Sequence, residues 1–234
     1  MLERRLFLTL IVAYLSGELT NGNGEMCASR IRTALASRLY RPRSVKSLEL
    51  AGLGEVQFAL HSLKDIWVSD PIDQGYPIES HIAQLLSEFL RKGDWFLDIG
   101  ANLGWFTIIG SRLVGDAGRV LAVEPDPFNL RLLRTNVRLN ACRNVDIFAV
   151  AVGDGNRKAS LHRSPDNQAD HQLAIESDRP DRVQVRVTSI DYLFRDRLPR
   201  VDFIKIDTQG SEAAILPMTR QVRCSGTGRR PRLL

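Results

Sequence analysis

Cysteine is scarce in this 234-residue sequence, which has only Cys27, Cys142 and Cys224. No two of them form a CxxC pair, so we expect neither a zinc knuckle nor a redox-active dithiol. Three widely separated cysteines also exclude a disulfide-rich secreted fold. The sequence therefore predicts reduced thiols and a cytoplasmic location.

A hydrophobic run long enough to cross a bilayer is also missing. Residues 6–15 are mostly apolar, but ten residues fall short of the about 20 that a spanning helix needs. Arg4 and Arg5 precede this run, which is therefore either the core of a secretory signal or a packed helix. We expect residues 1–46 to be an N-terminal helical extension with no integral membrane segment.

The central part of the chain has no excess of positive charge, although the whole chain has a formal net charge of +5. The excess lies at the two ends, and the last 18 residues contain five arginines and no acid. A nucleic-acid groove needs basic side chains on the folded body, so we expect no nucleic-acid partner. The basic ends leave a membrane-surface or partner-binding module as one alternative.

Periodicity divides the rest of the chain into distinct regions. Alternating runs over residues 47–74, among them the extended run 65–70, predict a β-hairpin region with Gly52 and Gly54 in its turn. Apolar positions at helical spacing predict a helix within 77–94 that stops at Gly93.

Strand and helix patterns then alternate. Strands are expected at 95–100, 119–125, 145–152 and 201–207, with helices over 102–115 and 127–140. Such alternation predicts an α/β fold with a doubly wound, mostly parallel sheet and right-handed crossovers, so that residues 75–216 form one domain. Two further extended segments are expected at 158–162 and 182–190, and Ser189 is placed to cap a short helix.

Ligands of open parallel sheets bind at the carboxyl ends of the strands. A dinucleotide needs three glycines in a G-x-G-x-x-G loop, and here Asn102 replaces the middle one. Asp98 would also face the phosphates unfavourably, although an NAD(P)-binding oxidoreductase stays an alternative. S-adenosylmethionine carries no phosphate, so Asp98 suits its ammonium group and Glu124 suits its ribose hydroxyls.

The segments "FLDIGANLGWFTI", "VLAVEPDPFNLRLLRTNVRLN" and "VDFIKIDTQGSE" together resemble the FkbM family of S-adenosylmethionine-dependent methyltransferases. The resemblance implies a Rossmann-like class I methyltransferase fold. It also implies a set of cofactor-binding residues, with Glu124 as the ribose acid, Phe128 as an adenine neighbour and "GYPIE" as the source of Glu79. The set is Glu79, Asp98, Gly100, Ala101, Asn102, Gly104, Glu124, Pro125, Phe128 and Asp207.

The resemblance further implies O-methylation of a hydroxyl on a sugar, glycolipid or secondary metabolite by direct in-line transfer. His171 is the best candidate for a general base because of its ordinary pKa, and its loop, 167–171, resembles a family element. Asp207, with Gly210 and Glu212, matches another family element, and it would position either the acceptor hydroxyl or the methionine end of the cofactor. No set of residues has metal-ligand spacing, so no metal is expected.

The alternating strand and helix pattern ends at Pro217, which interrupts the last expected helix. Residues 217–234 read as a disordered, arginine-rich tail, which leaves the sheet incomplete at its C-terminal side and the fourth strand with an unpaired edge. Two explanations follow: a truncated or frame-shifted product, or a short variant whose open edge pairs with another copy or chain. An incomplete sheet also keeps open a non-catalytic remnant that binds the cofactor.

Overall fold

The computed structural model describes residues 40–62, 65–163, 172–174, 182–194, 201–208 and 232–234. The chain divides into two compact units, residues 1–39 and 40–234, and all described residues belong to the second. The predicted helical extension up to residue 39, His171, Gly210 and Glu212 lie outside the described residues, as does most of the predicted tail.

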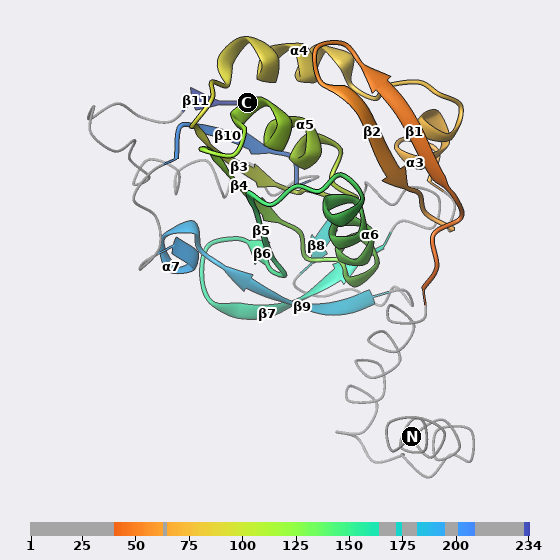
Figure 1. Cartoon of the computed structure of the whole chain (residues 1–234). Helices are drawn as coiled ribbons and strands as arrows, with labels where there is room; N and C mark the ends of the chain where they lie inside the picture. Colours follow the sequence, from red (N-terminus) through yellow and green to blue (C-terminus); the bar gives the residue numbers. More distant parts are fainter. Residues whose placement is uncertain (1–39, 63–64, 164–171, 175–181, 195–200, 209–231) are drawn as a thin grey trace, which may run out of the picture. The chain divides into compact units, whose positions relative to one another are not determined.

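A parallel sheet forms the centre of the described unit, as predicted, and it has five strands where the sequence predicts four (Figure 1). Its strands lie in the order β11 (Arg232–Leu233), β10 (Phe203–Ile206), β3 (Trp95–Ile99), β4 (Arg119–Val123) and β5 (Val145–Phe148). The chain runs from β3 outward to β5 and returns to the other side of β3 as β10. The direction of winding therefore reverses between β3 and β10, and such a reversal leaves a crevice at the carboxyl ends of the strands.

Two helices connect these strands. Helix α5 (Trp105–Val114) follows β3 and ends at Gly115, whose φ is 65°. Helix α6 (Pro127–Leu139) follows β4 and has a strong start, since Pro127 occupies the first position and the Asp126 carboxylate accepts the amides of Phe128 and Asn129.

Both faces of the sheet are covered. Side chains alternate along each strand, so Phe96 and Phe203 pack with α5 and the N-terminal elements, while Leu97 and Ile204 face the other way. The second face is covered by α7 (Ile190–Phe194), in which the Ser189 hydroxyl accepts the Tyr192 amide as predicted. This double coverage is the Rossmann-like arrangement that the sequence predicts.

One predicted strand is divided between the central sheet and a second sheet. The apolar run 145–152 is not continuous, because β5 ends at Phe148 and β6 (Ala151–Val152) pairs with β9 (Arg182–Thr188). The order of this sheet is β6, β9, β7 (Arg157–His162) and β8 (Gln172–Ala174). A continuous apolar run does not show where a chain leaves one sheet for another.

The N-terminal elements are a hairpin and two helices. Strands β1 (Val45–Leu50) and β2 (Gly54–Ala59) form the expected antiparallel hairpin, and α4 (Ser80–Phe89) lies within the predicted helical range but ends before Gly93. The predicted extended run 65–70 is wrong, because its end belongs to helix α3 (Ser69–Asp73). Asp65 explains the difference, since its carboxylate accepts the Ser69 amide and hydroxyl at 3.0 and 2.6 Å.

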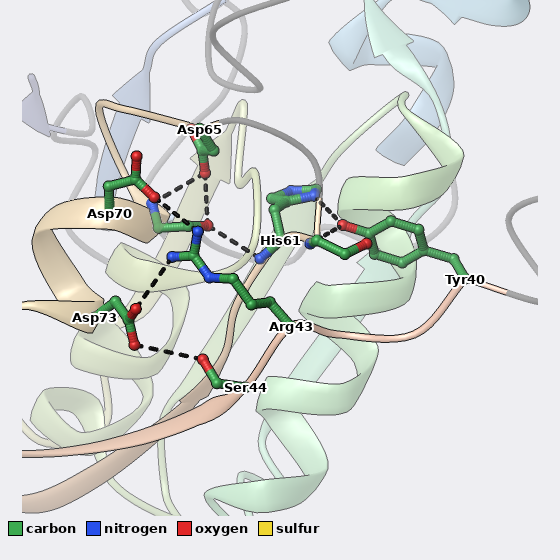
Figure 2. Close-up of polar contacts among 9 residues, drawn as sticks. Tyr40, Arg43, Ser44, His61, Asp65, Asp70 and Asp73 are labelled. Carbon is green, nitrogen blue, oxygen red and sulfur yellow. Dashed lines mark hydrogen bonds and ion pairs between the residues drawn. The ribbon is translucent and has the colours of Figure 1, made fainter.

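Polar contacts tie the beginning of the unit to α3 (Figure 2). The Arg43 guanidinium lies 2.9 Å from the Asp70 carboxylate and 3.5 Å from that of Asp73. The Tyr40 hydroxyl lies 2.7 Å from Nδ1 of buried His61. These contacts fix the segment that includes α3, which forms one wall of the cavity described below.

Asn136 of α6 and Asn140, directly after the end of this helix, hold the hairpin against the domain. Oδ1 of Asn136 accepts the Ala59 amide at 2.7 Å, and its Nδ2 donates to the carbonyls of Ala59 and Leu103 at 3.3 and 2.7 Å. One turn later, Asn140 exchanges the same pair of bonds with Gln57 at 2.9 and 2.7 Å. The two side chains thus extend β2 as a neighbouring strand would.

The C-terminal end corrects another expectation. Arg232–Leu233 is strand β11 and pairs in parallel with Phe203 and Ile204 of β10. The backbone of Leu234 continues the ladder, with its amide bonded to Ile204 at 2.9 Å and its carbonyl to Ile206 at 3.0 Å. The predicted disorder is therefore wrong for residues 232–234, and so is the predicted unpaired edge of β10.

Replacing Asn136 with leucine tests this docking. Asn136→Leu keeps a similar side-chain volume but leaves a buried amide and two carbonyls without their partner, so we expect the free energy of unfolding to fall by about 2–4 kcal/mol. Urea denaturation followed by circular dichroism measures this loss. The matched control is Arg134→Ala, an exposed site on the same helix, where about 0.5 kcal/mol or less is expected. Equal losses in both variants would contradict the role of Asn136.

Candidate cofactor site

A cavity of about 500 Å³ lies at the carboxyl ends of β3, β4 and β10. This is the edge of the sheet at which the winding reverses, where a ligand is expected. Residues of several regions line it. The strand ends and the loop after β3 contribute Ile99, Gly100, Ala101, Asn102, Leu103, Val123, Glu124, Pro125, Lys205, Asp207 and Thr208. The α3 region and the segment before α4 contribute Trp67, Val68, Pro71, Pro77, Ile78 and Glu79, helices α5 and α6 contribute Trp105, Phe106 and Asn129, and the second sheet with the residue before it contributes Val150, Ala151, Val152 and Leu161.

Gly100 allows the ends of β3 and β10 to meet. Its φ is 81°, and a Cβ at this position would overlap the backbone carbonyl oxygen of Asp207. The Asp207 amide in turn donates to the carbonyl of Ile99 at 3.0 Å. Glycine is therefore required here both by the backbone conformation and by the close approach of β10.

The loop 100–104 uses its own amides within the protein. Each of its five backbone N–H groups donates to an acceptor within the fold, so none of the five is left to cradle a phosphate. The bonds are Gly100 and Ala101 to Val123 O at 3.0 Å each, Asn102 to Glu124 Oε2 at 2.8 Å, Leu103 to Asn102 Oδ1 at 2.6 Å and Gly104 to Ala101 O at 2.9 Å.

Glu124 lies at the centre of this arrangement and is only 4% exposed. One carboxylate oxygen accepts the Asn102 amide, and the other accepts the Asp126 amide at 2.8 Å and the Asn129 side-chain amide at 3.5 Å. Burial raises the pKa of Glu124 to about 8, while the hydrogen bond from the Asp126 amide opposes this rise. The two backbone amides occupy two of the about four lone-pair positions of a carboxylate, and the Asn129 contact at 3.5 Å is long, so the remaining positions are available to ribose hydroxyls in the cavity.

Asp98 has a different place from the one predicted. It is fully buried and is not among the residues that line the cavity. Its carboxylate accepts the Thr107 hydroxyl at 2.6 Å and lies 3.6 Å from Lys205 Nζ. Burial raises the pKa of Asp98, and the charge of Lys205 lowers it. Asp98 thus contacts Lys205 from the buried side, and its predicted bond to the cofactor ammonium, direct or through water, stays a prediction.

The other predicted residues separate into two groups. Glu79, Gly100, Ala101, Asn102, Glu124, Pro125 and Asp207 all line the cavity, whereas Gly104 and Phe128 do not. The Phe128 ring instead packs edge-on against Tyr40, with the Arg163 guanidinium 4.3 Å from its centroid. His171 lies outside the described residues.

Two features of the cavity were missed by sequence reasoning. Lys205, which is 5% exposed, lines the cavity within 3.4 Å of the Asp207 carboxylate. A lysine inside the apolar strand "FIKI" could have revealed it, because buried lysines need a partner. The wall formed by Trp67 and Pro71 is the second feature, and no motif points to it.

The geometry defines a Rossmann-like α/β domain with a cavity at the reversal point of its sheet. Residues 98–230 match the family model described as the methyltransferase FkbM domain. The match covers more than half of the chain, so the chain belongs to the FkbM methyltransferase domain family.

Curated relatives match over shorter stretches. The chain is 38% identical over 70 residues to a probable cobalt-precorrin-6B C(15)-methyltransferase (decarboxylating) of Sulfolobus acidocaldarius, covering 30% of this chain and 36% of that one. It is 29% identical over 90 residues to protein-L-isoaspartate O-methyltransferase 2 of Archaeoglobus fulgidus, covering 37% and 40%. The chain thus spans less than half the length of these two relatives.

Solved structures also show similarity. A methyltransferase FkbM from Methylobacillus flagellatus KT has a TM-score of 0.39 at 20% identity, covering 59% of this chain and 36% of that one. A precorrin-6y C5,15-methyltransferase from Geobacter metallireducens GS-15 has a TM-score of 0.38 at 20% identity, covering 61% and 57%.

Two further properties of the described residues bear on the site. No helix among them is both long and apolar enough to span a membrane. Within the same residues, no three His, Cys, Asp or Glu side chains are grouped as metal ligands.

The pKa of Glu124 predicts a pH dependence of stability. In the folded chain Glu124 keeps its proton up to about pH 8, but in the unfolded chain it loses the proton near its ordinary pKa of 4.5. The unfolded chain therefore binds fewer protons in this window, and stability falls as pH rises. Relative to Glu124→Gln, the wild type should lose stability from pH 5 to pH 8, by at most about 1.4 kcal/mol per pH unit. Urea denaturation at each pH measures both proteins, and parallel curves would contradict this assignment.

Proposed function

We propose that this chain uses S-adenosylmethionine to methylate a hydroxyl group of a sugar, glycolipid or secondary metabolite. The observation that carries the proposal is the Glu124 carboxylate in the wall of the cavity at the reversal point of the sheet. Membership of the FkbM family supports the same cofactor. The cytoplasmic location that the cysteines predict stays a prediction.

The residues of the cavity fit this cofactor. Glu124 would accept the two ribose hydroxyls, since both its oxygens are held in place by backbone amides. Asp207 and Glu79 supply negative charge for a ligand that carries cationic groups. The loop amides are engaged within the fold, which supports a ligand without a pyrophosphate over NAD(P).

The chemistry needs little from the protein beyond orientation. The bound sulfonium would supply an already activated methyl group, and the electrons of its carbon–sulfur bond would stay on sulfur. The chain would hold the acceptor oxygen in line with that bond and take up the hydroxyl proton. His171 is the proposed base. Asp207 is paired with Lys205 at the strand ends, so we assign it to the methionine end of the cofactor and not to the acceptor.

The part of the cavity lined by the α3 region supports an acceptor with an apolar face. It contains Trp67, which is 64% exposed, together with Pro71, Pro77, Ile78 and Glu79. An indole face beside a carboxylate suits a ring that has both C–H and hydroxyl groups.

The rival functions make different predictions. A non-catalytic remnant would bind the cofactor and transfer no methyl group to any acceptor. A membrane-surface module would depend on the arginine-rich ends. Arg232 is one of these arginines, and it is engaged within the fold, because it donates to the carbonyl of Phe89 at 3.1 Å and lies over its ring.

Binding measurements test the cofactor. By isothermal titration calorimetry, S-adenosylhomocysteine should bind the full chain, and NADH should not. Measured above pH 8, where Glu124 is ionised, Glu124→Ala should weaken S-adenosylhomocysteine binding by about 1.5–3 kcal/mol, because a charged acceptor is lost. Glu88→Ala, an exposed acid on α4, is the control and should leave the affinity unchanged. Binding of NADH instead would contradict the proposal.

Transfer measurements test the base. His171→Ala should lower turnover about 100-fold or more while the affinity for S-adenosylhomocysteine stays unchanged. The assay follows a radiolabelled methyl group onto a panel of monosaccharides, glycolipids and polyketide-type alcohols. Full turnover in the variant would show that the base lies elsewhere, and transfer to none of these acceptors by the wild type would favour the remnant.

A further inference from the structure

Lys205 stands out because it is a charged side chain in the middle of a central strand. Its Cα lies opposite that of Asp98 in the β3–β10 ladder, and its ammonium lies 3.6 Å from the Asp98 carboxylate and 3.4 Å from that of Asp207. It also lies 4.9 Å from the centroid of the Phe106 ring. These contacts keep the ammonium group in one place at the wall of the cavity.

The charges around the cavity are unequal. Below about pH 8 Glu124 is protonated, which leaves Glu79 and Asp207 as the charged acids that line it, and among its described lining residues Lys205 is the one cation. S-adenosylmethionine shows the opposite imbalance, with an ammonium, a sulfonium and a single carboxylate. The carboxylate is the one anionic group of this ligand, and Lys205 is the one cationic side chain among the described lining residues that could bind it.

Resting on the function proposed above, we propose that Lys205 and Asp207 form a charge pair complementary to the zwitterionic amino acid end of the methyl donor. In this arrangement the Lys205 ammonium binds the carboxylate, and the Asp207 carboxylate binds the ammonium. Asp98 acts as a positioning residue, because it holds the lysine from the buried side. Charge-assisted hydrogen bonds of this kind are the strong ones in a protein site.

The start of helix α5 is a second candidate for binding the carboxylate of the methyl donor. The amides of loop 100–104 are engaged within the fold, but the first N–H groups of α5 also lie beside the cavity, since Trp105 and Phe106 line it. The start of a helix attracts anions. The test must therefore separate the lysine from the helix, and it does so through the ligand as well as through the protein.

Calorimetry with two natural ligands makes that separation. Decarboxylated S-adenosylmethionine keeps the adenosine, sulfonium and ammonium groups and lacks only the carboxylate. We expect the full wild-type chain to bind S-adenosylmethionine about 10- to 100-fold more tightly than the decarboxylated form. In Lys205→Met this preference should fall to about twofold or less, whereas Lys205→Arg should keep it because the charge remains.

A second variant keeps the test valid if Lys205→Met does not fold. Removing the lysine alone leaves the buried Asp98 charge uncompensated, so the double variant Lys205→Met/Asp98→Asn removes both charges together. It should also lose the preference for the carboxylate. If either variant kept the wild-type preference, the helix start would be the partner and the Lys205 assignment would be overturned. If the wild type bound neither ligand, the proposed function itself would fail.

Discussion

The buried carboxylate of Glu124 connects the parts of the structure on which the site depends. It accepts the Asn102 amide from the loop after β3 and the Asp126 amide at the start of α6. Two loops from neighbouring strands are thereby fixed around one side chain that also lines the cavity. Removing it would release both loops as well as a ligand contact. Glu124 must be ionised to bind hydroxyls well, but its burial raises its pKa to about 8. Ionising this buried carboxyl group therefore costs the fold free energy, while the same group supplies the contact for binding.

Much of the fold could be predicted because its patterns are local. Buried strands such as Trp95–Ile99 and amphipathic helices such as Pro127–Leu139 follow from periodicity and from their capping residues. Glu124 and Asp207 could be placed in the cavity for the same reason, since carboxyl ends of parallel strands share one edge of the sheet. Features that depend on pairing between distant strands could not be predicted this way.

Asp98 and Lys205 show that limit most clearly. The sequence places Asp98 near a strand end, but which way its side chain points depends on the pleat and on Thr107 of α5, whose hydroxyl donates to the Asp98 carboxylate. Lys205 becomes part of the site only because β10 lies beside β3 in a register that sets it opposite Asp98. Likewise, β11 consists of two residues whose strand conformation depends on the edge of β10, and the run 145–152 divides between two sheets.

A crystal structure of the full chain with bound S-adenosylhomocysteine tests the central claim most directly. The account predicts that the nucleoside lies in the crevice between β3 and β10, with both ribose hydroxyls within hydrogen-bonding distance of the Glu124 carboxylate. A ligand bound elsewhere, or one whose ribose hydroxyls make no contact with Glu124, would contradict it.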